Sequence, residues 1–292
     1  MLDHTKSLNH LLERVETLID RVELLFPEPL RLPDWKQVKA CYWRKHMQSG
    51  IFQPVHHFHT IRLQDLQGIS EQKAQLEQNT RQFLQKQPAN NVLLWGARGT
   101  GKSSLIKALL NEYASTGLRL IEVEKHDLID LPMIVETLYT CPERFIIFCD
   151  DLSFEQDDAS YKALKSMLDG SISAPPENVL IYATSNRRHL LPEYMRENLE
   201  AHLIEGEIHQ GEAVEEKISL SDRFGLWLSF YPFNQELYLK IVYYWLSSLG
   251  IRNINAEIDN KALQWALKRG SRSGRSAWQF ARDWAGRQAT LD

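Results

Sequence analysis

The sequence predicts an α/β fold in which helices cover both faces of a parallel sheet, followed by a smaller helical module. Three observations predict it. Short, uniformly apolar segments recur along the chain, as expected of strands buried on both faces. Segments with apolar residues at helical spacing separate them. After Pro232 only helical patterns remain.

The five predicted strands span residues 91–95, 118–123, 145–149, 179–183 and 226–230. The helices among them are predicted over residues 72–85, 102–114, 131–138 and 158–168. Those of the C-terminal module are predicted over residues 235–249, 259–269 and 275–288. We therefore assign residues 61–231 to the α/β core and residues 232–292 to the helical module.

Residues 1–60 form a predicted N-terminal helical extension. Apolar residues recur at helical spacing over residues 8–25, and Pro27-Glu28-Pro29 ends that pattern. This amphipathic helix either binds a partner or packs on the body of the protein, and packing is the simpler interpretation. Residues 30–60 are predicted to be irregular.

Composition favours a globular protein that does not enter a membrane. The chain has 292 residues, of which 43% are hydrophobic and 25% charged, and no apolar run approaches the ~18 residues of a membrane span. The N-terminus lacks the pattern of a signal peptide, so we expect a cytoplasmic location. The three cysteines are too few and too scattered for a disulfide framework.

The net charge of −4 argues against extensive, sequence-independent binding to nucleic acid. Its distribution is uneven, however. Residues 152–216 hold 13 acidic and 5 basic residues, whereas residues 261–292 hold 7 basic and 2 acidic ones.

A phosphate-binding loop follows the first predicted strand. Residues 96–103, GARGTGKS, fit the pattern G-x-x-x-x-G-K-[ST], with an apolar strand before and a helix after. Glycines let the backbone N–H groups point at phosphate oxygens, and the helix N-terminus adds positive potential. Lys102 is predicted to contact the β- and γ-phosphates and Ser103 to ligate Mg²⁺. The nucleotide-binding residues are predicted to be Gly96, Ala97, Arg98, Gly99, Thr100, Gly101, Lys102, Ser103 and Ser104.

Two carboxylates follow the third predicted strand. In FIIFCDD, residues 145–151, Asp150 is predicted to hold Mg²⁺ and Asp151 to activate or orient the attacking water. The alternative is a helix N-cap or a solvated strand end. Asn186, which ends the polar tail of the fourth strand, is predicted to hold a water against the γ-phosphate; the alternative is a turn residue. No NKxD motif is present, which disfavours GTP.

Together these segments resemble the AAA+ superfamily from about Ile61 to Arg287. GARGTGKSS is similar to Walker A, FIIFCDD to Walker B and YATSN to sensor 1. More narrowly, NNVLLWGARGTGKSSLIKALLNEY, FCDDLSFE and IYATSNRRHLLPE look like the bacterial ATPase family called domain of unknown function 815.

The resemblance implies a five-stranded sheet of order 5-1-4-3-2, a helical lid, and ATP sites between subunits of a homo-oligomer. It also implies that Arg223 acts on a neighbour's γ-phosphate and that Arg275 acts in cis from the lid. A surface salt bridge is the alternative role for Arg223 and for Arg275. Arg272 is a second candidate for the role of Arg275. Arg187 and Arg188 are weaker candidates for the arginine finger, the residue that contacts a neighbour's γ-phosphate. The acidic stretch 200–216 is either a partner-contact loop or hairpin or a solvated insertion.

These expectations leave three functions open. The first is a Mg²⁺-dependent ATPase that oligomerises, turns ATP into ADP and remodels a protein client. The second is a helicase-loader-like ATPase on DNA, suggested by the basic segment 261–292 but disfavoured by the acidic segment 152–216. The third is a slow nucleotide switch, because Asp151 stands where many AAA+ proteins have glutamate.

Overall fold

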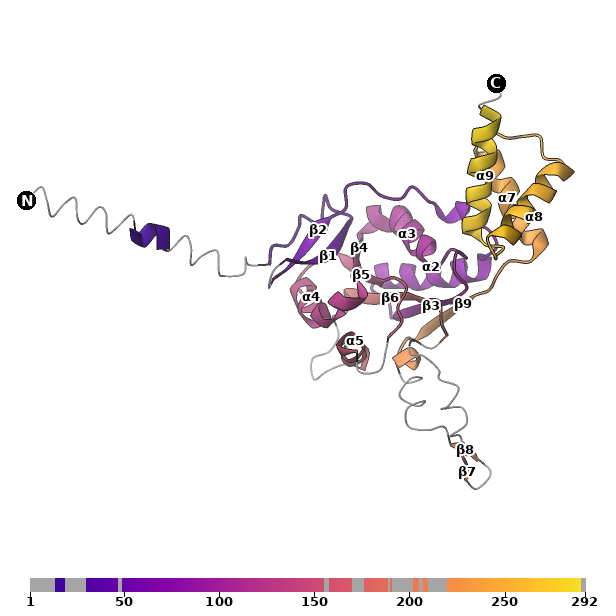
Figure 1. The fold of residues 1–292 in the computed structure, drawn as a ribbon. Helices are drawn as coiled ribbons and strands as arrows, with labels where there is room; N and C mark the ends of the chain where they lie inside the picture. Colours follow the sequence, from indigo (N-terminus) through magenta and orange to yellow (C-terminus); the bar gives the residue numbers. More distant parts are fainter. Residues whose placement is uncertain are drawn as a thin grey trace, which may run out of the picture.

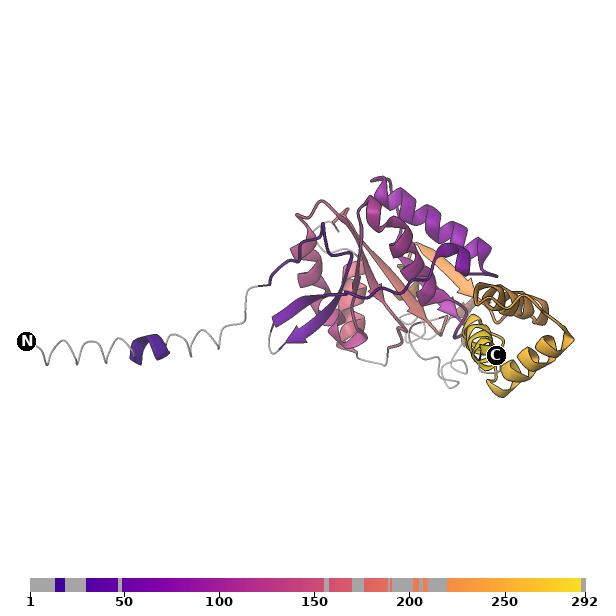
Figure 2. The same ribbon diagram turned by 90° about the horizontal axis from the view of Figure 1, so that it is seen from above.

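The computed structural model describes residues 14–18, 30–46, 49–154, 158–169, 176–188, 190, 202–204, 207–209 and 220–289. A seven-stranded sheet forms the centre of this part of the chain, and three C-terminal helices form a separate group beyond one end of the sheet (Figures 1 and 2). Of the predicted helix over residues 8–25, residues 14–18 are helical and exposed, and the rest lies outside the described residues.

The strands of the sheet are β1 (Ala40–His46), β2 (Ser49–Pro54), β3 (Val92–Gly96), β4 (Leu118–Glu122), β5 (Arg144–Cys149), β6 (Val179–Ser185) and β9 (Leu226–Phe230). They follow the order β2-β1-β4-β5-β6-β3-β9. All neighbouring pairs are parallel except β1 and β2, which are antiparallel. The five predicted strands thus lie side by side as β9-β3-β6-β5-β4.

The prediction of a five-stranded, wholly parallel sheet is wrong, because β1 and β2 extend it to seven strands of mixed direction. Residues 40–46 and 49–54, predicted to be irregular, form these two strands, so the sheet extends into the proposed N-terminal extension. Trp43 and Phe52 point inward and pack edge to face with ring centroids 5.0 Å apart. Burial of these aromatic side chains stabilises two strands whose outward residues are polar or exposed.

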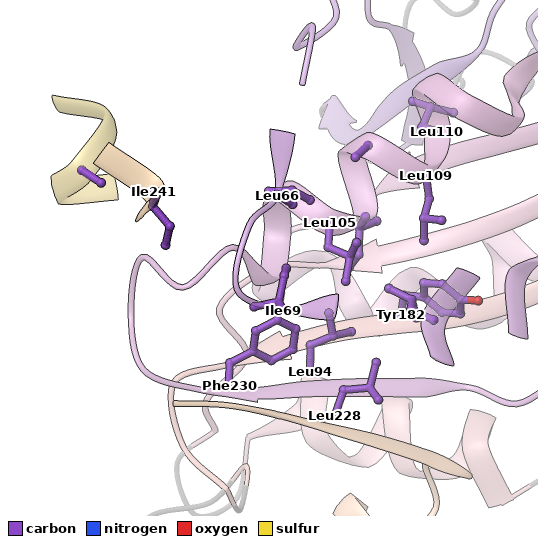
Figure 3. Packing of buried hydrophobic residues seen from close by; sticks show 14 of the residues in the cluster. Leu66, Ile69, Leu94, Leu105, Leu109, Leu110, Tyr182, Leu228, Phe230 and Ile241 are labelled. Carbon is purple, nitrogen blue, oxygen red and sulfur yellow. The ribbon is translucent and has the colours of Figure 1, made fainter. Parts of the chain in front are cut away.

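Alternating residues of each central strand face two separate apolar clusters. One face packs against α2 (Ser70–Leu84) and α3 (Lys102–Tyr113), and the other against α4 (Leu131–Leu138) and α5 (Ala159–Asp169). In Figure 3, Leu105 and Leu109 of α3 lie over Leu94, Tyr182 and Leu228 of the sheet. Burial on both faces explains the nearly continuous apolar strands.

The C-terminal module consists of α7 (Gln235–Ser248), α8 (Ala256–Lys268) and α9 (Gly274–Ala289). Asn234 and Asn255 cap the first two helices, accepting hydrogen bonds from the backbone N–H groups of Leu237 and Ile258 at 2.8 and 3.1 Å. Tyr238 is buried in this module and donates from its hydroxyl to Ala262 O. We refer to these three helices, with the segment that leads into them from residue 232, as the lid.

The remaining described elements are the 3₁₀ turns η1 (Leu63–Asp65), η2 (Ala114–Thr116) and η3 (Lys125–Asp130) and a two-stranded hairpin, β7 (His202–Ile204) with β8 (Glu207–His209). The hairpin lies within the acidic stretch 200–216, the remainder of which falls outside the described residues. Among the helices that the structure describes, none combines the length and apolar character needed to cross a membrane.

Candidate functional site

The glycine-rich loop turns sharply where β3 ends. Gly96 has a φ of +128°, and a Cβ atom there would lie 2.0 Å from Phe230 O of the adjacent strand β9. The next residue, Ala97, donates its N–H to the same Phe230 carbonyl at 2.9 Å. Gly101, with a φ of +105°, precedes the first turn of α3. These positive φ angles explain why glycine is needed at both ends of the loop.

Lys102 lies inside this loop with only 7% of its surface exposed. Its Nζ donates to Gly96 O and Ala97 O at 2.8 Å each, and to Asn186 Oδ1 at 3.2 Å. Burial lowers the pKa of Lys102 to about 8; Asp151 and Asp150 oppose this shift, while Arg275 and Arg98 add to it. A lysine held in this way is ready to exchange carbonyl partners for an anion.

Asp150 joins three elements at the edge of the sheet where the parallel strands end. Its Oδ1 accepts hydrogen bonds from Ser103 Oγ of α3 at 2.6 Å and from Thr184 Oγ1 of β6 at 2.5 Å. A carboxylate and a hydroxyl held together are the oxygen ligands that Mg²⁺ accepts. Sequence reasoning missed Thr184, although its place in the polar tail of the fourth strand was the available signal.

Asp151 is held in the left-handed region, with a φ of +52°. Its backbone N–H donates to Thr184 Oγ1 at 2.9 Å, and its Oδ1 accepts a hydrogen bond from Asn186 Nδ2. The second carboxylate oxygen lies 3.9 Å from Arg98 Nη2. The structure therefore brings the predicted catalytic pair Asp151 and Asn186 together, directly beside Lys102.

A pocket of about 740 Å³ opens over the loop. Its polar lining includes the loop, Asp150, Asp151 and Asn186. Its apolar lining comes from the segment before α2 and from the lid, namely Leu66, Ile69, Phe233, Ile241, Trp245 and Trp278. Sequence reasoning did not identify this apolar lining, since its residues are far apart in the chain and were not recognisable as a motif.

The lid contacts the loop directly. The N–H of Arg275, in the first turn of α9, donates to Gly99 O at 3.2 Å, and the Arg275 side chain lines the pocket. Arg272 is exposed and is not among the residues that line the pocket. Of the two candidate lid arginines, Arg275 is therefore the one beside the loop.

Arg223 does not line this pocket. It lies ahead of β9, and its Nε forms an ion pair with Asp169 of α5. Arg188, at the end of β6, lies over the ring of Trp95 with its Cζ 5.7 Å from the ring centroid. None of Arg187, Arg188 and Arg223 is thus among the residues that line the pocket with Lys102.

Comparison with protein families gives one match over most of the chain. The family described as "Protein of unknown function (DUF815)" matches residues 36–288. The match begins at residue 36, so it includes β1 and β2. Comparison with curated proteins finds no match.

Three AAA+ proteins are among the solved structures similar to this chain. The Aeropyrum pernix ORC1 protein in complex with DNA has a TM-score of 0.54 at 14% identity, covering 78% of this chain and 62% of that one. The Thermotoga maritima RuvB Holliday junction branch migration motor has a TM-score of 0.49 at 16% identity, covering 76% and 63%. Replication initiator DnaA bound to AMPPCP and single-stranded DNA has a TM-score of 0.49 at 14% identity, covering 76% of this chain and 63% of that one. This chain spans less than two thirds of each of these proteins.

Proposed function

Because this chain belongs to the DUF815 family and has the AAA+ fold, we propose that it binds ATP with Mg²⁺ in the 740 Å³ pocket and hydrolyses it to ADP and phosphate. The observation that carries this proposal is the convergence of Lys102, the Ser103–Asp150 pair and the Asn186–Asp151 pair on one loop. Phosphates, a divalent cation and an attacking water each need one of these groups.

The residues present fit both ligands. Gly96 packs directly against the backbone of Phe230, which fixes the start of the loop, and Lys102 supplies a buried positive charge for a phosphate. Ser103 and Asp150 would hold Mg²⁺, which when bound neutralises phosphate charge. Asp151 would accept a proton from the attacking water, and Asn186 would position that water. The apolar side chains that line the pocket would contact the adenine base of ATP.

We further propose that the active form is a homo-oligomer that remodels a protein client. Arg223 supports this proposal because it lies outside the pocket of its own chain, where a finger that serves a neighbouring subunit belongs. An ATP molecule held by two subunits would favour their association by mass action.

A DNA-associated ATPase is the second candidate function. Seven basic and two acidic residues in the segment 261–292 favour it, and two arginines there lie over tryptophan rings: Arg269 over Trp265 and Arg282 over Trp278. Binding to single-stranded DNA that falls steeply with salt would support this function. DNA binding that does not depend on salt, or no binding in low salt, would exclude it.

Calorimetry with ATP, with and without Mg²⁺, tests the main proposal, together with a phosphate-release assay at saturating ATP. Lys102→Ala should abolish detectable ATP binding while the protein remains folded. Lys268→Ala, on the exposed end of α8, is the matched control and should bind ATP as the wild type does. Equal ATP affinity in Lys102→Ala and wild type would refute the nucleotide site. Binding without turnover would instead support the slow switch.

A further inference from the structure

Arg98 occupies a position in the loop whose neighbours are fixed on both sides. The N–H of Ala97 donates a hydrogen bond to Phe230 O, and the carbonyl of Ala97 accepts one from Thr100 Oγ1 at 2.7 Å. Gly99 is bound through its carbonyl to the N–H of Arg275. The backbone of Arg98 is therefore anchored, while its side chain is 77% exposed and lines the pocket.

A chain of polar contacts connects Arg98 to Lys102. Lys102 donates to Asn186, Asn186 donates to Asp151, and the other oxygen of Asp151 lies 3.9 Å from Arg98 Nη2. Lys102 and Arg98 thus lie at opposite ends of this chain of contacts. The chain includes Asp151, the carboxylate proposed to accept a proton from the attacking water. A terminal phosphate bound by Lys102 would share the pocket with Arg98 as a second cation.

The ion pair between Arg98 and Asp151 is weak. It spans 3.9 Å, and both side chains are mostly exposed, Asp151 by 60%. Exposed pairs of this kind contribute little to stability, because water screens them and both side chains lose conformational freedom. A phosphate oxygen is a stronger partner for a guanidinium, because Arg–phosphate hydrogen bonds are charge-assisted and often bidentate. Arg98 can therefore leave Asp151 for a phosphate at little cost.

Other cations in the pocket have different positions. The lysine and arginine side chains that line it are Arg98, Lys102, Lys107 and Arg275. Arg275 comes from the lid, and Lys107 lies one helical turn beyond Ser103 along α3. Arg98 is the one within 4 Å of Asp151. Because Asp151 is the proposed acceptor of the water proton, Arg98 is the pocket cation best placed to contact the γ-phosphate that the water attacks.

We propose that Arg98 is a cis-acting arginine for ATP hydrolysis, held by Asp151 before nucleotide binds and transferred to the γ-phosphate afterwards; this inference rests on the proposed ATPase function. As the water oxygen bonds to the γ-phosphorus, the bond from that phosphorus to the β–γ bridging oxygen breaks. The electron pair stays on ADP, and Asp151 accepts a water proton. Arg98 stabilises the negative charge that develops on the γ-phosphoryl oxygens.

The test compares ADP binding with and without aluminium fluoride, which with ADP mimics the transferring phosphoryl group. The parent protein carries Arg223→Ala, so that a neighbour's arginine cannot contribute. It is compared with variants of this parent that also carry Arg98→Ala, Arg98→Lys or the control Arg272→Ala. The unmodified wild type is measured alongside for ADP binding. In the Arg223→Ala background without a further change, aluminium fluoride should tighten ADP binding at least ~10-fold, since transition-state analogues bind more tightly than ground-state ligands.

Arg98→Ala should bind ADP alone within ~3-fold of its parent but lose this tightening, and its kcat for ATP should fall ~10²-fold or more. Arg98→Lys should recover part of the tightening, because lysine keeps the charge but not the planar fork. Arg272→Ala should match its parent. Equal tightening in Arg98→Ala and its parent, or no tightening in the parent, would overturn the role of Arg98 while leaving ATP binding intact. Failure of the wild type to bind ADP at all would overturn the proposed function as well.

Discussion

The hydroxyl of Ser103 donates a 2.6 Å hydrogen bond to Oδ1 of Asp150, joining the first turn of α3 to the end of β5. Thr184 of β6 donates to the same oxygen at 2.5 Å, so three elements hold this carboxylate in place. A side chain fixed in this way loses little conformational freedom when a cation binds, which favours a preorganised metal site.

We predict that Ser103→Ala removes the stimulation of turnover by Mg²⁺ but leaves nucleotide binding intact. ADP affinity in the absence of Mg²⁺ should stay within ~3-fold of wild type, because backbone N–H groups and Lys102 remain. Turnover with Mg-ATP should fall ~10²-fold or more, since a metal contributes several kcal/mol to the transition state. Thr184→Ser, which keeps a hydroxyl beside Asp150, serves as the control. A Ser103→Ala protein with normal Mg²⁺-stimulated turnover would exclude this ligand assignment.

A second prediction follows from the pKa of Lys102, which burial lowers to about 8. Anionic phosphates favour the charged form of the lysine, so the complex binds a proton that the free protein has partly lost above pH 8. ATP affinity should therefore fall as pH rises from 8 to 10, by up to ~10-fold per pH unit. Calorimetry in two buffers of different ionisation enthalpy would detect the proton uptake. Lys102→Arg should show no such pH dependence in this range, even if it binds ATP less tightly. Proton uptake that persists in Lys102→Arg would assign it to another group.

The sequence allowed the loop, the two carboxylates and Asn186 to be predicted because each lies in a short contiguous motif at the end of an apolar strand. The family resemblance is confirmed by the match over residues 36–288. The hairpin β1–β2 was not predicted, because its register depends on long-range burial of Trp43 and Phe52 rather than on a local pattern. The choice between Arg272 and Arg275 likewise needed the packing of the lid on Gly99.

We predict that Gly96→Ala destabilises the protein far more than an ordinary glycine substitution. The new Cβ would lie 2.0 Å from Phe230 O, and the φ of +128° is unfavourable for alanine. Gly250→Ala is a matched control, because Gly250 also has a positive φ, of +87°, but nothing lies within 4 Å of its Cβ position. Backbone strain of this kind costs ~1–3 kcal/mol, so Gly96→Ala should exceed Gly250→Ala by the additional cost of the clash. Urea unfolding of both variants measures the difference, and equal free energies of unfolding would contradict it.

Asp151→Asn should keep Mg-ATP binding but slow turnover. An amide cannot take the proton of the attacking water, and loss of a positioned base typically costs ~10²–10⁴-fold. Phosphate formation in chemically quenched single turnovers, with the protein in excess over ATP, measures this step without product release. Asp222→Asn, at a carboxylate outside the pocket, is the control. If Asp151→Asn turned over at the wild-type rate, another group, with Asp150 the nearest candidate, would have to act as the base.

The last prediction concerns Arg223, which forms an ion pair with Asp169 rather than lining the pocket of its own chain. If it completes a neighbour's site, ATP should promote oligomers, and specific turnover should rise with protein concentration. Arg223→Ala should bind ATP normally but lose this rise. The expected loss lies toward the lower end of the ~10³–10⁵-fold range known for trans arginines, or below it, because Arg98 would sustain basal turnover.

Mixing Arg223→Ala with Lys102→Ala separates action in trans from action in cis. A mixed oligomer can pair an intact Lys102 of one subunit with an intact Arg223 of the next, so the mixture should exceed the summed activities of its components. The same mixture with Arg98→Ala in the subunit that retains Lys102 should recover much less, since Arg98 has to be in the same chain as the nucleotide. Light scattering that gives a monomer at every concentration with ATP, together with full turnover in Arg223→Ala, would make this protein a stand-alone ATPase.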